Sequence, residues 1–263
     1  MNNNRFNIKH NGKNTPKMPS KERAVQDKVS SLYDDIRYRK PYSRTYHLWW
    51  SKMMLSSVPA EGKWLDIGCG TGWLLIAEKE LGGNRKLIGI DLSHEMLVRA
   101  QNNGMTVAEA DVLNLPFKNN YFDVIHSKGV LHHIDDFESA LREIKRVLKP
   151  NGTLILADPN SGPLRWMENL IGHRDDHFSE THKSLSADLY NKILSRHFKT
   201  THFSYFGLFA YPFCIPDIID LGRYFPAPTL LVKTLIGVDR LLTKIQGLRR
   251  LSWAFFVIAK KTI

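Results

Sequence analysis

The chain has 263 residues, of which 43% are hydrophobic and 24% are charged, a balance typical of a globular protein. Its two cysteines, Cys69 and Cys214, provide neither a disulfide framework nor the spacing of a metal site. The polar N-terminus lacks the apolar core of a signal peptide, and no apolar run approaches the roughly 18 residues of a membrane span, so we expect a cytoplasmic protein.

The net charge of +11 is concentrated at the two ends of the chain. Residues 1–60 hold 12 Lys and Arg against 4 Asp and Glu, and residues 200–263 hold 8 against 3, whereas the segment between them holds 17 against 19. Such a basic excess favours an acidic partner, for example a phosphorylated substrate, an anionic membrane or a nucleic acid. A basic surface that only aids solubility is the alternative.

The first sixty residues divide into a tail and a helical cap. Residues 1–20 are polar and are expected to be disordered. Apolar residues then recur at spacings of three and four from Val25 to Ile36, which predicts a helix within a cap over 21–60. Pro41 interrupts this pattern, and an aromatic-rich segment from Tyr46 to Leu55 follows. Its side chains are expected mainly to pack, although some could roof a ligand pocket.

Residues 61–160 alternate strands with helices. The predicted strands lie at 63–67, 86–90, 106–110, 122–126 and 153–157. Ser93 and Asp136 are suitable N-caps for the helices after the second and fourth strands. The turn from Lys149 to Gly152 is expected to end the second of these helices. This alternation predicts a doubly wound, Rossmann-like α/β fold on a mainly parallel, seven-stranded sheet.

Residues 161–263 are expected to complete the sheet and to cover it. The predicted elements are a loop over 161–182, a helix over 184–195 and strands over 199–205 and 252–260. Between these two strands, an apolar and mainly helical insertion over about 207–247 is a candidate substrate lid.

The segment Leu65 to Gly72, LDIGCGTG, joins the first strand to a helix predicted over 73–81. Its glycines let the backbone turn sharply and approach a ligand closely. Their G-x-G-x-G spacing differs from that of dinucleotide sites, and no Walker A lysine follows. We therefore expect an adenosyl ligand without phosphates, with Asp66 accepting hydrogen bonds from a cationic amine. An ordinary tight turn is the alternative for this segment taken alone.

Acidic residues end the next two strands. Ligands of parallel α/β sheets bind beyond the carboxyl ends of the strands. Asp91 follows Asp66 by 25 residues, near the offset of an acid that binds ribose hydroxyls. Asp111 ends the third strand, where a carboxylate can accept from an adenine amine, and residues 126–129 end the fourth. One such Asp alone could be a helix cap or a surface charge, but the set predicts a nucleoside pocket.

The combined pattern resembles the class I S-adenosylmethionine-dependent methyltransferases, and within them the type 11 group that includes quinone-biosynthesis methyltransferases. The matching segments are LDIGCGTG at 65–72, GIDLSHEML at 89–97, EADVLNLPFKNNYFDVI at 109–125, and GVLHHIDD and LREIKRVLKPNGTLIL within 129–156. The resemblance covers about residues 60–160 and implies that 61–160 form the S-adenosylmethionine-binding core.

The resemblance also implies the cofactor-binding residues. The set is Tyr33, Asp66, Gly68, Cys69, Gly70, Gly72, Asp91, Leu92, Met96, Asp111, Val112 and Ser127. In such enzymes the segment from Asp66 to Gly72 holds the methionine part of the cofactor, Asp91 the ribose and Asp111 the adenine.

His132 and His133 are the candidate catalytic residues. They follow the fourth strand, beside the expected place of the methyl group, so either could take a proton from the acceptor. A packed or helix-capping histidine is the alternative for His132. The stretch 173–182 is rich in His, Asp and Glu, but its spacing matches no standard motif, so we predict no metal. The Asn/Asp-Pro-Pro-aromatic signature of amino-group methylation is absent after the fourth strand, which counts against adenine-N6 and glutamine-amide substrates.

The lid candidate sets the expectation for the substrate. It combines aromatic and aliphatic residues over 205–236 with five basic residues from Lys233 to Arg250. This composition suits a small or lipophilic metabolite, including an acidic one, and peripheral contact with an anionic membrane; simple packing on the sheet is the alternative. We expect SN2 methyl transfer to O, N or C. An RNA or protein methyltransferase and a non-catalytic S-adenosylmethionine-binding protein are the alternatives, and the lack of an RNA-binding motif disfavours nucleic acid.

Overall fold

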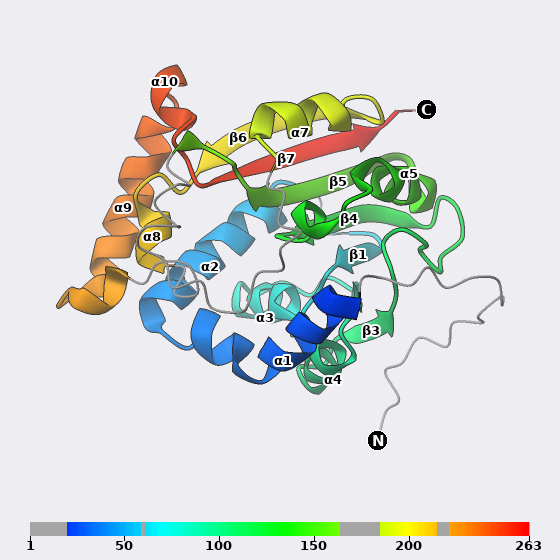
Figure 1. Ribbon diagram of the computed structural model, residues 1–263, viewed down its shortest axis with the longest axis horizontal. Coiled ribbons are helices and arrows are strands. Elements are labelled where there is room, and N and C mark those ends of the chain that lie inside the picture. The colour runs from blue at the N-terminus through cyan, green and yellow to red at the C-terminus, as the bar shows by residue number, and fades with distance from the viewer. Residues whose placement is uncertain (1–19, 59–60, 164–184, 215–220, 263) are drawn as a thin grey trace.

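The computed structural model describes residues 20–58, 61–163, 185–214 and 221–262. They contain a seven-stranded sheet of order β3-β2-β1-β4-β5-β7-β6 (Figure 1). The strands are β1 (Trp64–Ile67), β2 (Leu87–Asp91), β3 (Thr106–Glu109), β4 (Phe122–Lys128), β5 (Leu148–Pro159), β6 (Phe198–Phe206) and β7 (Ala254–Lys261). Strands β1 to β5 run parallel, and β7 runs antiparallel to β5 and β6. The predicted doubly wound, mainly parallel sheet is confirmed.

The helices cover both faces of the sheet. They are α1 (Ser20–Arg37), α2 (Pro41–Leu55), α3 (Trp73–Glu80), α4 (His94–Asn102), α5 (Phe137–Val147), α7 (Ala187–Leu194), α8 (Ala210–Cys214), α9 (Pro228–Leu242) and α10 (Gln246–Arg249), with short 3-10 helices η1 (Leu131–His133) and η3 (Leu221–Tyr224). Alternate strand residues supply two cores: Ile155 and Ala157 pack on the side of α2 and α9, and Leu154 and Leu156 on the side of α5 and α7. A strand buried on both faces needs such an unbroken apolar run.

Both predicted helix caps are confirmed. The Ser93 hydroxyl accepts the Met96 N–H at 3.2 Å, and the Asp136 carboxylate accepts the Ser139 N–H at 3.0 Å. These caps satisfy amide groups that the first turn of a helix leaves without a partner. They fix where α4 and α5 begin, and so where the carboxyl ends of β2 and β4 meet the loops of the site.

The predicted start of the fifth strand is wrong. β5 begins at Leu148, which pairs with Phe122, and pairing resumes only at Thr153 with Val124. The turn residues 149–152 therefore bulge out of one longer strand, with Asn151 at φ +61°. The predicted interruption at Pro41 is confirmed, because α1 ends at Arg37 and Pro41 begins α2, a position where its missing N–H costs nothing.

The insertion after β6 is helical where it is described. α9 packs against α2 and α8, and the buried carboxylate of Asp239 accepts the backbone N–H groups of Phe209 and Ala210 at 2.9 and 3.1 Å. This capping ties α9 to the start of α8. Over the described ranges, no helix is both long enough and apolar enough to cross a membrane.

Candidate functional site

The glycine turn has the backbone that its sequence predicts. Gly68, Gly70 and Gly72 have φ angles of +65°, +52° and +86°, in the left-handed region that favours glycine. A Cβ on Gly68 would lie 2.3 Å from a methyl group of Val130, whereas a Cβ on Gly70 would meet nothing within 4 Å. The turn is therefore packed at its first glycine and open at its second.

Cys69 holds the turn against β2. Its backbone N–H donates to the Ile90 carbonyl at 2.9 Å, and its thiol is buried. Burial raises the pKa of this thiol well above its usual range, and the nearby Asp91 and Asp66 carboxyls add to the effect. The thiol therefore stays protonated, so Cys69 serves as a small packing residue rather than a nucleophile.

Asp91 is fixed by the backbone around it. Its Oδ2 accepts the Gly70 N–H at 2.9 Å, and its Oδ1 accepts the N–H groups of Leu92 and Ser93 at 2.8 and 3.0 Å. Burial raises the pKa of this carboxyl, which these hydrogen bonds oppose. Oδ2 keeps a further lone pair, so the group can also accept from a ligand hydroxyl.

Asp66 forms a buried pair with His126. The two residues are neighbours across β1 and β4, and Nδ1 of His126 lies 2.6 Å from Oδ1 of Asp66. Both side chains are almost fully buried, and both line the same pocket. The sequence pattern singled out Asp66 but missed this partner, because the pairing depends on strand register.

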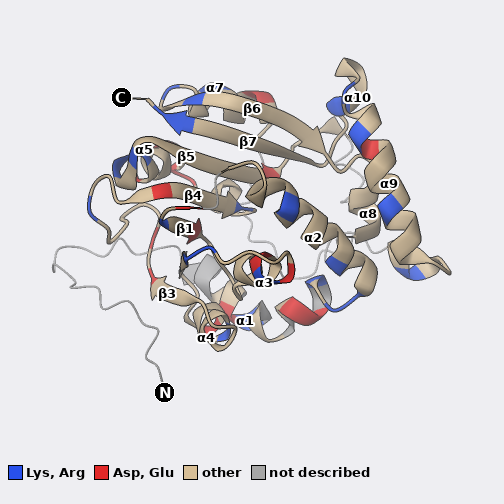
Figure 2. Ribbon diagram, turned by 180° about the vertical axis from the view of Figure 1, so that it is seen from behind, with Lys and Arg blue, Asp and Glu red and all other residues tan. Residues whose placement is uncertain are grey.

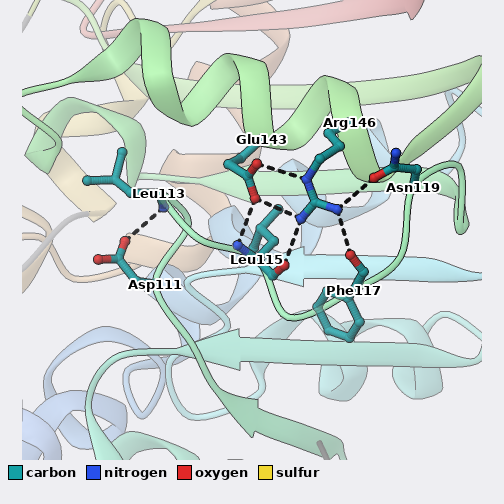
Figure 3. A network of polar contacts seen from close by, with 7 residues as sticks. All are labelled: Asp111, Leu113, Leu115, Phe117, Asn119, Glu143 and Arg146. Carbon is teal, nitrogen blue, oxygen red and sulfur yellow. Dashed lines mark hydrogen bonds and ion pairs between the residues drawn. The ribbon is translucent and has the colours of Figure 1, made fainter. Parts of the chain in front are cut away.

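The third acidic position lies on a braced loop. Asp111 Oδ1 accepts the Leu113 N–H at 2.8 Å, and its Oδ2 is buried without a partner (Figure 3). From α5, Arg146 donates to the carbonyls of Leu115 and Phe117, each at 2.7 Å, and pairs with Glu143. Those bonds hold the loop between β3 and β4 in place. The adjacent Val112 is buried in the core.

One pocket joins these strand ends to the helical cap. Its wall consists of Tyr33, Arg37, Tyr38, His47, Trp50, Asp66, Gly68, Cys69, Gly70, Thr71, Trp73, Leu74, His126, Lys128, Gly129, His132, His133, Pro159 and Tyr211. Seven residues singled out in the sequence are thereby brought together: Tyr33, Asp66, Gly68, Cys69, Gly70, His132 and His133. The other predicted residues, Gly72, Asp91, Leu92, Met96, Asp111, Val112 and Ser127, are not part of this wall.

Helix α1 is tied to the glycine turn by side chains. Asp34 accepts a hydrogen bond from the Thr71 hydroxyl, and Asp27 accepts one from the Ser93 hydroxyl. Burial raises the pKa of Asp34, which the bond from Thr71 opposes. These two contacts explain how Tyr33, far away in the sequence, reaches the pocket.

We call one side of the pocket the roof; it consists of Tyr38, His47, Trp50, Trp73, Lys128 and Tyr211. It combines aromatic rings with a cation. The Lys128 ammonium lies 4.3 Å from the Trp50 ring centroid and 3.2 Å from Nδ1 of His47. Burial, and then the charges of Lys128 and Arg37, lower the pKa of His47 well below its usual range. His47 is therefore neutral, and its Nδ1 accepts from Lys128.

A second buried carboxylate stands behind His132. Asp158, at the end of β5, lies 2.8 Å from Nδ1 of His132 and accepts the Tyr190 hydroxyl at 2.9 Å. Burial raises the pKa of Asp158 to about 7, although its hydrogen bonds oppose the rise. Neither Asp158 nor Tyr190 was singled out in the sequence. The sequence contains one signal: Asp158 directly follows the fifth predicted strand, and His132 follows the fourth.

Two buried polar atoms near the strand ends have no hydrogen-bond partner within the described part of the chain. Asp111 Oδ2 and Ser127 Oγ are both buried without a partner, as expected of groups that await a ligand. Gly70 leaves open space for that ligand. In the described parts of the chain, no three His, Cys, Asp or Glu residues gather as metal ligands would. The stretch 173–182 lies outside the described residues.

Comparisons with known proteins agree with this arrangement. Residues 65–156 match a family model described as a methyltransferase domain. The chain is 30% identical over 162 residues to a 2-phytyl-1,4-naphtoquinone methyltransferase of Nostoc, covering 56% of this chain and 70% of that protein. It is 32% identical over 139 residues to a demethylmenaquinone methyltransferase of Staphylococcus haemolyticus, covering 50% of this chain and 57% of the relative. The chain thus spans little more than half the length of that relative.

Solved structures share the fold at low identity. A possible histamine N-methyltransferase of Thermotoga maritima aligns with a TM-score of 0.60 at 17% identity, over 91% of this chain and 99% of that one. A phosphoethanolamine N-methyltransferase of Haemonchus contortus, solved with S-adenosylhomocysteine, aligns with a TM-score of 0.62 at 19% identity, over 95% of this chain and 62% of that one. The chain belongs to the class I S-adenosylmethionine-dependent methyltransferases.

Proposed function

We propose that the protein transfers a methyl group from S-adenosylmethionine to a small or lipophilic metabolite, at O, N or C. The observation that carries this proposal is the shared pocket: Asp66 and the glycine turn form one side, and His132 and His133 another. A cofactor side and an acceptor side therefore face the same cavity. Such an arrangement aligns two reactants, which is the main service that a protein gives to a direct displacement.

The cofactor would be held along the carboxyl ends of β1 to β4. Asp66 and the 68–72 turn would hold the methionine part, with Ser127 and Tyr33 beside it. Asp91 would accept from the ribose hydroxyls. The adenine would lie by Leu92 and Met96, with Asp111 and Val112 in contact with it. When bound, S-adenosylmethionine supplies a methyl group whose bond to sulfur breaks, with the electron pair staying on sulfur, as a bond to the acceptor forms.

The roof supports a lipophilic acceptor that carries an acidic or electron-rich oxygen. Trp50, Tyr38 and Tyr211 offer apolar ring surface, and Lys128 adds a positive charge among the rings. Rings of this kind bind flat apolar groups, while an ammonium favours an anionic oxygen. The Nostoc and Staphylococcus relatives are named for naphthoquinone-type substrates, which have this combination of an apolar body and polar oxygens.

Helix α9 supports peripheral contact with an anionic membrane. At about 100° per residue, Leu230, Val238 and Leu241 project within an arc of about 80°. Leu230 and Leu241 are 68% and 66% exposed. Lys233 and Arg240 project beside this arc, and Lys244 and the exposed Ile245 follow the end of the helix. In Figure 2 the ribbon of α9 is tan with blue bands and one red band. Asp239, the acidic residue of α9, is buried, so the exposed face of the helix is apolar and basic.

The enzymatic proposal is tested by a methyl-transfer screen. The purified chain is incubated with S-adenosylmethionine and a reduced 2-polyprenyl-1,4-naphthoquinone, and separately with lipid, metabolite, RNA and protein fractions. Release of S-adenosylhomocysteine with the naphthoquinol or a lipid fraction is the expected result. Transfer only to RNA or protein would replace the substrate class. Cofactor binding without any turnover would make the protein a non-catalytic S-adenosylmethionine binder.

The membrane proposal is tested by vesicle sedimentation. Binding is expected with phosphatidylcholine vesicles that contain phosphatidylglycerol and not with phosphatidylcholine alone. Replacing Lys233, Arg240 and Lys244 by Gln should reduce binding about tenfold or more, since each basic residue near such a surface contributes roughly 1 kcal/mol. The matched control replaces the exposed Lys118, Lys192 and Lys199 by Gln. This variant loses the same charge from other parts of the surface. Equal loss in both triple variants would contradict a docking role for α9.

A further inference from the structure

A buried chain of three side chains stands behind the acceptor side of the pocket. Tyr190 of α7 donates to Asp158 of β5, which in turn lies 2.8 Å from Nδ1 of His132 in η1. Asp158 and Tyr190 are each 1% exposed, and His132 is 8% exposed and lines the pocket. The three residues come from separate elements, so only the fold brings them together.

We infer that His132 takes the proton of the methyl acceptor, that Asp158 and Tyr190 are positioning residues for its ring, and that the acceptor is therefore a group that must lose a proton: a hydroxyl, an acidic C–H or an ammonium group. This inference rests on the proposed methyl transfer and deepens it. It concerns the half of the reaction that the cofactor does not supply.

The hydrogen bonds of Asp158 set the tautomer of His132. Besides Nδ1 of His132 and the Tyr190 hydroxyl, the carboxylate accepts the backbone N–H groups of Val130 and His132. An ionised carboxylate has no proton to give, so Nδ1 must carry the hydrogen in this contact. The lone pair of the neutral ring is then on Nε2. Above the Asp158 pKa of about 7, the ring is thus set to accept a proton at Nε2.

Tyr190 can act only as a donor here. Its ring packs between Phe137 and Phe255, with centroid distances of 4.7 Å to each. Burial, together with the negative charge of Asp158, raises the pKa of Tyr190 well above its usual range, so the hydroxyl keeps its proton. That proton is available to Asp158 and holds the carboxylate in one orientation.

The strand end and the helix are themselves joined. Asn160, two residues after Asp158, accepts the Ala187 N–H at 3.1 Å and donates to the Ser252 carbonyl at 2.9 Å. Ser186 caps α7 by accepting the Leu189 N–H. The distance from Asp158 to Tyr190 is therefore set by the start of α7 rather than by a mobile side chain. A fixed carboxylate of this kind stabilises the imidazolium that proton uptake creates.

The proton requirement defines the class of acceptor. A thioether attacks through a lone pair that it already has, so it needs no base, whereas an ammonium group has no free lone pair until it loses a proton. A hydroxyl or acidic C–H must release its proton, whose former bonding pair then forms the new bond to the methyl carbon. The proton goes to Nε2 of His132 and afterwards to solvent, and no further reactant is required.

The first experiment reads the ring directly and needs no acceptor. Histidine ¹⁵N NMR at pH 8 on the full chain, with the His132 signals identified by their loss in His132→Gln, should show hydrogen on Nδ1 and a lone pair on Nε2. Asp158→Asn should mix the two tautomers. A wild-type ring with hydrogen on Nε2 would overturn the inference whatever the activity.

The second experiment measures turnover with the reduced polyprenyl-naphthoquinone. His132→Gln and Asp158→Asn should lower kcat about 100-fold or more, with KM and cofactor Kd within about threefold of wild type. Tyr190→Phe, which keeps the packing, should lower kcat about three- to tenfold. The matched controls are Asp188→Asn and Tyr205→Phe, a surface pair joined at 3.3 Å that should leave kcat unchanged.

The outcomes separate this inference from the proposed function. Wild-type turnover that survives in His132→Gln overturns the proton-accepting role and leaves the methyltransferase proposal standing. A wild-type chain that turns over only acceptors without a proton to lose, such as thioethers, overturns the acceptor class. A chain that turns over no acceptor overturns the proposed function, and the inference with it. If Asp158→Asn does not fold, His132→Gln and Tyr190→Phe still decide the question.

Discussion

The floor and the roof of the pocket hold their side chains in different ways. On the floor, Asp66 pairs with His126 across neighbouring strands, and Gly70 donates its N–H to Asp91, which lies outside the pocket wall. On the roof, contacts are mostly between rings: Tyr38 stacks on Trp73 at 3.9 Å, and Tyr211 packs parallel to Trp253 at 5.9 Å. Hydrogen bonds fix direction, whereas ring contacts fill space and tolerate exchange.

The floor and the roof also come from different parts of the chain. The floor residues fall within 65–156, the part that matches the methyltransferase family model. Apart from Trp73, these rings lie outside that part: Tyr38 stands between α1 and α2, Tyr211 is in α8 and Trp253 directly precedes β7. The directional floor suits a cofactor whose polar groups do not vary, and the aromatic roof suits an acceptor that differs between relatives. Variants can test this division one surface at a time.

The largest expected effect comes from the floor. Asp66→Ala should weaken S-adenosylmethionine binding about 100-fold, because a hydrogen bond to a charged group is worth roughly 1.5–3 kcal/mol and the variant also leaves His126 without its partner. Titration calorimetry measures the change. Asp123→Ala is the matched control, since that carboxylate lies on β4 but contacts Lys63 and Lys149. Unchanged affinity in Asp66→Ala would remove Asp66 from the cofactor site.

Substitutions in the glycine turn should also have large effects. One should mainly lower the stability of the protein, and the other should mainly weaken cofactor binding. Gly68→Ala should lower the free energy of unfolding by roughly 2–3 kcal/mol, because the left-handed backbone disfavours a Cβ that would also meet Val130. Gly70→Ala should cost only about 1 kcal/mol of stability but about tenfold in cofactor affinity, since its methyl group would occupy open space in the pocket. Thermal unfolding and calorimetry separate the two. Identical behaviour of the two variants would contradict the finding that Gly68 is tightly packed and that Gly70 faces open space.

The roof should give the smallest effect, and only on the acceptor. Lys128→Met should raise KM for the naphthoquinol about three- to tenfold while the cofactor Kd stays unchanged, because the ammonium lies among the roof rings, 4.3 Å from Trp50 and 3.2 Å from His47. Steady-state kinetics at saturating cofactor provides both values. Lys118→Met is the matched control, since that ammonium lies 5.5 Å from the Tyr121 ring, away from the pocket. A rise in cofactor Kd instead would place Lys128 on the floor side.

Local signals in the sequence predicted most of the fold. The caps at Ser93 and Asp136, the apolar strands and the glycine turn each depend on neighbours a few residues away, and all appear as expected. The start of β5 was missed because Leu148 joins the sheet through Phe122, across a bulge that leaves no local signature. η1 was also missed, since a single 3-10 turn has too few residues to show a period.

The candidate site was predictable only in part, for the same reason. Asp66, Asp91 and Asp111 each end a strand, so their common edge follows from the alternation of elements. Their partners depend on register and on packing between distant segments. His126 reaches Asp66 because β4 adds beside β1, and Tyr190 reaches Asp158 because Asn160 holds the first residue of α7. No local pattern encodes these distances.

The position of β5 has a consequence for how the molecule opens. This strand pairs with β4 on one side and β7 on the other from Thr153 to Ala157. A strand held on both sides opens only in the largest unfolding events, so its amide hydrogens should exchange with solvent among the slowest in the chain. Asp158 directly follows this segment, whereas the aromatic roof stands on helices outside the sheet. Substitutions in the roof should therefore leave the exchange of these β5 amides unchanged.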